Sequence, residues 1–107
     1  MPRLRKSSAD TRRADLARAV RTAVDGPGTL DPLIRRAAFT GGEIADAGAA
    51  RYVDTVVRHA YRVTDEDVEA LRGSGYTESQ ILELTIAAAL GAGQRRLDAA
   101  LAALGEA

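Results

Sequence analysis

Apolar and polar positions alternate with a helical period near the start of the chain. From about residue 9 onward, Leu16, Val20 and then Ala23 or Val24 recur at i, i+4 and i+7 or i+8. Residues 25–28 then bring two glycines and a proline together, which cannot continue a helix. The pattern predicts one helix followed by a Gly/Pro linker over residues 9–28.

The second predicted helix has a well-defined start. Asp31 is a good N-cap residue, and Pro32 follows it at the first helical position, where its missing N–H costs nothing. Residues 40–42, Thr-Gly-Gly, are expected to end the helix. Its predicted buried stripe consists of four apolar residues, Leu33, Ile34, Ala37 and Ala38.

A longer helix is predicted from about Glu43 to Arg62. Apolar residues recur there at i, i+3, i+4 and i+7, which is the spacing of one buried helix face. The residues at these positions are Val53, Val56, Val57 and Ala60.

Two further helices begin with capping signals. Thr64 precedes three acidic residues at 65–67, which suit the positive end of a helix dipole, and Val68 and Leu71 anchor the short helix that follows. Thr77 and Gln80 have the spacing of a capping box, in which each side chain satisfies a free backbone donor of the other residue.

The helix that begins after Thr77 is apolar nearly all the way round over residues 81–90, so we expect it at the centre of the fold. Residues 91–93, Gly-Ala-Gly, are expected to kink or break it. A separate final helix is then predicted from Leu97, Ala100, Leu101 and Leu104. No segment has a strand pattern, so the fold class predicted is all-α, with about five to six helices.

Composition limits the kinds of function that the chain can have. Its 107 residues suit one domain and bury only about two thirds of the unfolded surface, which favours oligomerisation. The formal net charge is zero, so we expect neither nucleic-acid nor membrane binding. Residues 1–22 are nevertheless basic, with seven basic and two acidic side chains, and residues 1–8 are expected to form a flexible arm.

Cysteine is absent, which excludes disulfides, thiolate metal ligands and cysteine nucleophiles. The single histidine and the scattered carboxylates show no metal-ligand spacing, so we expect neither a metal nor a cofactor. The chain also shows no apolar core of a signal peptide and no apolar run of membrane-spanning length. The expected location is cytoplasmic.

The second half of the chain, about residues 50–104, resembles the carboxymuconolactone decarboxylase superfamily, which includes the AhpD-like alkylhydroperoxidases. The resemblance rests on the acidic helix start and the helix of residues 63–72, on residues 75–84, and on the Ala-rich residues 87–93. It implies an AhpD-like helical domain over residues 29–107 that assembles with itself into trimers or hexamers.

Thiol-dependent members of that family carry a Cys-x-x-Cys motif followed by a histidine. An alignment without gaps at Gly75 places the two cysteine positions at Ala60 and Val63 and the histidine position at Asp67. Since the chain has no cysteine, thiol peroxidase activity is excluded. The resemblance therefore implies a cysteine-less member, and the leading hypothesis is an oligomeric binding or structural protein.

One branch of the family works without cysteine or cofactor on small lactones or carboxylates, which makes an acid–base enzyme the first alternative. Asp54 and His59 are the candidate acid–base residues on the helix before Thr64. Three neighbours are candidates for binding a small carboxylate ligand, namely Arg58, Tyr61 and Arg62. The competing interpretation is a solvated helix face with an i, i+4 ion pair between Asp54 and Arg58.

Glu83 is a further catalytic candidate, because a carboxylate inside the most apolar helix has a raised pKa if it is buried alone. The competing interpretation pairs it with an arginine across a helix or subunit interface. A second alternative function is an adaptor that binds its partner through the basic arm at residues 1–8.

Overall fold

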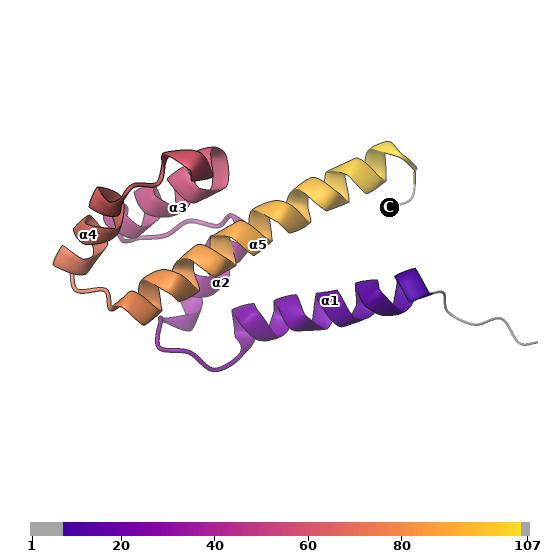
Figure 1. Ribbon diagram of the computed structural model, residues 1–107, viewed down its shortest axis with the longest axis horizontal. Coiled ribbons are helices and arrows are strands. Elements are labelled where there is room, and N and C mark those ends of the chain that lie inside the picture. The colour runs from indigo at the N-terminus through magenta and orange to yellow at the C-terminus, as the bar shows by residue number, and fades with distance from the viewer. Residues whose placement is uncertain (1–7, 106–107) are drawn as a thin grey trace, which may run out of the picture.

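The computed structural model describes residues 8–105, which form an all-α domain of five α-helices (Figure 1). Within these residues there is no strand, so the predicted fold class is confirmed. The helices and one short 3-10 turn, η1, have the bounds α1 Ser8–Asp25, α2 Pro32–Thr40, α3 Ala47–His59, η1 Ala60–Arg62, α4 Asp65–Gly73 and α5 Glu78–Ala103.

Helix α5 is the central element, as its apolar sequence predicts. Helices α1, α2, α3 and α4 all contact it, and Figure 1 shows it running the length of the molecule. Leu84 in its first half is fully buried. Four of the eleven buried core residues are alanines, and the full set is Leu30, Ala38, Ala49, Tyr52, Val53, Val56, Leu71, Ile81, Leu84, Ala87 and Ala88.

The break that we expected in α5 at residues 91–93 does not occur. The helix continues through both glycines to Ala103. Gly91 is instead a packing position, because a Cβ added there would overlap the carbonyl oxygen of Phe39 at the end of α2. The glycine lets α2 approach the backbone of α5 closely. The helical turns on either side of Gly91 keep α5 continuous at this position.

The predicted buried stripe of α2 is wrong at one position. Ala38 is fully buried and Ile34 partly so, but Leu33 is 77% exposed. The side chain that faces inward is Arg35, which is only 4% exposed. A buried guanidinium needs a partner, and Arg35 finds one in Glu83 of α5, far away in the sequence.

Helix α3 begins later than predicted, at Ala47 instead of about Glu43. Asp46 caps it by accepting hydrogen bonds from the backbone N–H groups of Gly48 and Ala49. The hydroxyl of Tyr76 also donates to Asp46, at 2.6 Å. The hydrogen bond from Tyr76 contributes most, and together these bonds lower the pKa of Asp46. They also fix the start of α3. The predicted inward position of Ala60 is also wrong, because Ala60 lies exposed in η1.

The caps predicted for α2, α4 and α5 are confirmed. The side chain of Asp31 accepts from Leu33 at the start of α2. Thr64 and Thr77 open α4 and α5, each within a reciprocal capping box. Gly41 ends α2 in the left-handed conformation, with φ of 79°, which a residue with a side chain adopts only at a cost.

Helix α1 and the C-terminal half of α5 extend together beyond the rest of the fold (Figure 1). Of the arm predicted at residues 1–8, residues 1–7 lie outside the described part, and Ser8 already belongs to α1. No helix within residues 8–105 is long and apolar enough to span a bilayer.

Candidate functional site

Asp54 and Arg58 form the ion pair that their i, i+4 spacing predicts. The guanidinium Nε of Arg58 lies 2.7 Å from the carboxylate of Asp54, and both side chains are exposed. They line an open groove of about 320 Å³ beside the loop that follows α2. Arg95 of α5 lines the same groove, so two guanidinium groups and one carboxylate meet there.

His59, Tyr61 and Arg62 form a second group at the end of α3 and in η1. The rings of His59 and Tyr61 meet edge to face at 5.9 Å. The guanidinium of Arg62 lies 5.6 Å from the centre of the Tyr61 ring, a cation–π contact. Tyr61 is 79% exposed, so this group lies in solvent in the single chain.

Glu83 holds the linker before α2 against α5. Its carboxylate accepts hydrogen bonds from the backbone N–H groups of Thr29 and Leu30 and from the Thr29 hydroxyl, at 2.8–3.1 Å. The guanidinium of Arg35 lies 3.5 Å away and also donates to the carbonyl oxygen of Gly26. Glu83 is therefore the hub of a network that anchors residues 26–30.

This network sets the protonation state of Glu83. Burial favours the neutral acid, but the hydrogen bonds from Thr29 and Leu30 and the charge of Arg35 outweigh it, so the pKa of Glu83 is lowered. The structure thus shows an arginine-paired carboxylate across a helix interface, not one with the raised pKa of a general acid. Within residues 8–105, Glu83 makes these polar contacts with Thr29, Leu30 and Arg35, and none of them is with His59 or Asp54.

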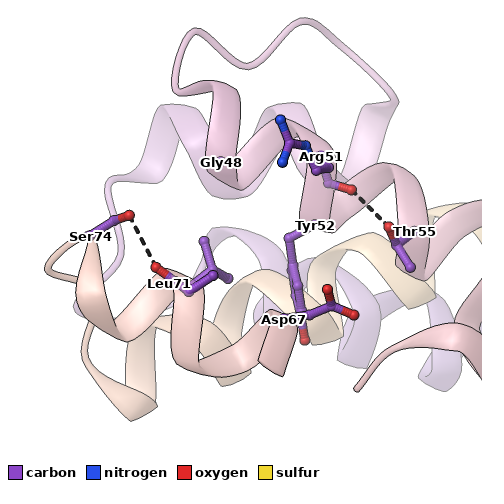
Figure 2. A pocket seen from close by; sticks show the side chains of 8 residues that line it. Gly48, Arg51, Tyr52, Thr55, Asp67, Leu71 and Ser74 are labelled. Atoms are coloured by element: carbon purple, nitrogen blue, oxygen red, sulfur yellow. Dashed lines mark hydrogen bonds between the residues drawn. The ribbon is translucent and has the colours of Figure 1, made fainter. Parts of the chain in front are cut away.

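A further pocket of about 260 Å³ lies between α3 and α4 (Figure 2). The polar groups at its wall are largely engaged with the protein itself. Thr55 donates to the carbonyl oxygen of Arg51, Ser74 donates to that of Ala70, and Asp67 belongs to the capping box of α4. The Arg51 guanidinium has no ion pair among the described residues, but no sequence motif distinguishes it.

An exposed apolar face lies along α5. Seven residues, spaced by 4, 3, 4, 4, 3 and 4 positions, share one face of this helix, and all seven are exposed and uncharged. We call them the α5 stripe: Leu82, Ile86, Ala89, Gly93, Leu97, Ala100 and the C-cap residue Leu104. Leu82 is 58% exposed and Leu104 is 72% exposed.

The surface next to the α5 stripe is apolar as well. A groove of about 220 Å³ separates α1 from α5, and residues of the stripe form part of its wall. Leu16 and Val20 of α1 face this groove across from Leu90 of α5. Leu16 is 59% exposed, so the uncovered apolar surface extends from α5 onto α1.

The α5 stripe escaped prediction because the expected break at residues 91–93 divided it. Its first half was interpreted as buried core and its second half as a separate amphipathic helix. The signal was present in the sequence, since the seven positions keep one spacing through Gly93. Only the continuity of α5 joins them into one face.

Comparison of the chain with protein-family models, with curated proteins and with solved structures finds no match. The fold and surface therefore define the class of protein directly. It is a cysteine-free, all-α domain with an apolar face along its longest helix.

Proposed function

We propose that this protein is an oligomeric binding or structural protein that acts through contacts between helices. The observation that carries the proposal is the α5 stripe. A helix face turned to water normally carries charged and polar residues, whereas this one carries none over seven positions. Uncovered apolar surface of this extent is typical of sites of protein association.

The large apolar side chains that stay uncovered support the same proposal. Besides Leu82 and Leu104, Leu97 of the α5 stripe is 45% exposed and Ile86 is 40% exposed. A zero net charge adds no long-range repulsion between copies.

The family resemblance enters as part of this proposal. We propose a scaffold of the carboxymuconolactone decarboxylase and AhpD-like type that lacks the redox centre. The all-α fold and the capping boxes at Thr64 and Thr77 agree with the quoted motifs. Without cysteine, such a scaffold has no thiol chemistry to perform, and the α5 stripe favours association and binding as its role.

A small-carboxylate site is the second candidate function, and the groove with Arg58 and Arg95 favours it. Both guanidinium groups line the groove, and Asp54 neutralises only the first. A carboxylate ligand would compete with Asp54 for Arg58. Calorimetric titration with acetate or succinate tests this idea: heat that disappears in Arg58→Met supports it, and equal heats in both proteins contradict it.

Substitution within the α5 stripe tests the leading proposal. Ile86→Glu places a charge on the stripe, so we expect the sedimentation coefficient to fall to that of a single chain. Ala99→Glu is the matched control, because Ala99 is an exposed residue of α5 outside the stripe. Wild type that sediments as a single chain at every micromolar concentration would overturn the proposal, as would an assembly unaffected by Ile86→Glu.

A further inference from the structure

The α5 stripe has an internal symmetry. Its spacing of 4, 3, 4, 4, 3 and 4 reads the same in both directions, and Gly93 is its midpoint. Two successive 11-residue steps join Leu82, Gly93 and Leu104. An 11-residue repeat corresponds to about 3.67 residues per turn, close to a straight α-helix, so the stripe keeps facing one direction along the whole of α5.

The side-chain sizes in the stripe are complementary about the same midpoint. If a second α5 lies antiparallel across it, with Gly93 facing Gly93, Ile86 faces Ala100 and Ala89 faces Leu97. Leu82 faces Leu104 at both ends. In the four inner pairs a large side chain thus meets a small one, and glycine at the centre lets the two backbones approach closely.

We infer that the α5 stripe binds the α5 stripe of a second copy of this chain, antiparallel and with a two-fold axis at Gly93. This inference rests on the proposed function and names the partner and the register. A two-fold contact requires a self-complementary surface, which the palindromic spacing provides. No charge within the stripe has to be desolvated when the copies meet.

The neighbouring helix fits this arrangement. The two-fold axis places both α1 helices on the same side of the α5 pair. Leu16 and Val20, which line the groove beside Gly93, then lie along the seam between the copies. The pair of α1 and α5 that extends beyond the other helices in each chain becomes half of a four-helix arrangement.

Cysteine trapping tests the register, because the natural chain contains no cysteine to interfere. A Cβ added at Gly93 meets no atom within 4 Å, so Gly93→Cys is tolerated within the chain. A disulfide requires Cα atoms about 4.4–6.8 Å apart, which residue 93 satisfies only near the axis. We expect mild oxidation to convert most of Gly93→Cys into a covalent dimer.

Gly73→Cys is the matched control, since its added Cβ is equally free and it lies on α4, away from the stripe. The relative direction of the two α5 helices is tested by mixing two further variants, Leu82→Cys and Leu104→Cys. An antiparallel pair yields several-fold more mixed disulfide between these variants than disulfide between identical chains. A parallel pair yields the reverse and would overturn the inference.

The outcomes separate the inference from the proposed function. The wild-type chain could be oligomeric while Gly93→Cys forms no more disulfide dimer than Gly73→Cys. The interface between the copies then lies elsewhere, and only the inference fails. If the wild-type chain is monomeric throughout the micromolar range, both fail. The inference and the proposed function are both supported if Gly93→Cys forms more disulfide dimer than Gly73→Cys and if Leu82→Cys forms a mixed disulfide with Leu104→Cys.

Discussion

The carbonyl oxygen of Phe39 occupies the space that a side chain at Gly91 would need. This contact joins the end of α2 to the middle of α5, and it depends on glycine at residue 91. Arg95 lies one turn further along α5 and donates a hydrogen bond to the same carbonyl oxygen. One backbone group of α2 is therefore held by two positions of α5.

Gly91→Ala is expected to destabilise the fold, since its methyl group cannot enter without moving the backbone of α2. Overpacking of this kind costs about 1–3 kcal/mol. Gly73→Ala is the control, because nothing lies within 4 Å of its added Cβ, and alanine in a helix is favoured by up to about 1 kcal/mol. Urea unfolding of both variants checks the prediction, and equal stabilities would contradict the packing role of Gly91.

Arg95 and Arg96 stabilise the C-terminal ends of two different helices. Arg95 donates to Phe39 of α2, and Arg96 donates to the carbonyl oxygen of Val57 in α3, at 2.7 Å. A cation at a helix C-terminus contributes about 0.3–1 kcal/mol. We expect Arg95→Met and Arg96→Met each to lose about that much, with nearly additive effects in the double variant because they cap separate helices.

Arg58→Met is the comparison for these two substitutions. Its exposed pair with Asp54 contributes less than about 0.5 kcal/mol, so thermal unfolding should barely change. If Arg58→Met loses as much stability as Arg95→Met or Arg96→Met, the contacts at the helix ends stabilise the fold no more than an exposed ion pair does. That result would contradict the prediction.

Glu83 should make stability depend on pH in the acid range. Its pKa in the folded chain lies below the usual 4.5, so its contribution is complete above that value. The contribution is lost as the pH falls through the lowered pKa. Glu83→Gln removes the charge that Thr29, Leu30 and Arg35 surround, and we expect a loss of about 1–3 kcal/mol at neutral pH.

Unfolding free energies measured between neutral pH and pH 3 check this. The wild type should lose stability on acidification more steeply than Glu83→Gln, so that the two proteins converge at low pH. Parallel curves would contradict the role assigned to the carboxylate.

Local chemistry allowed much of the fold to be predicted from the sequence. Asp31, Thr64 and Thr77 were recognisable as caps because a cap depends on residues within one helix turn. The late start of α3 was missed because Asp46 receives part of its support from Tyr76, thirty positions away. Arg35 was missed for the same reason, since its partner Glu83 lies on α5.

The candidate site shows the same limit. The Asp54–Arg58 pair follows from spacing on one helix and was predicted. Arg95 lines the same groove as Asp54 and Arg58 but lies on another helix, and no local sequence pattern predicts that it lies near them. The catalytic roles suggested for His59, Asp54 and Glu83 stay predictions, as do the binding roles of Tyr61 and Arg62.

The molar mass of the wild-type chain in solution tests the central claim most directly. Light scattering across micromolar concentrations should give twice 11.3 kDa, or an even multiple of the single chain, because the α5 contact pairs copies about a two-fold axis. A mass of one chain at every concentration would contradict the account, and a closed assembly of three would contradict the two-fold α5 contact.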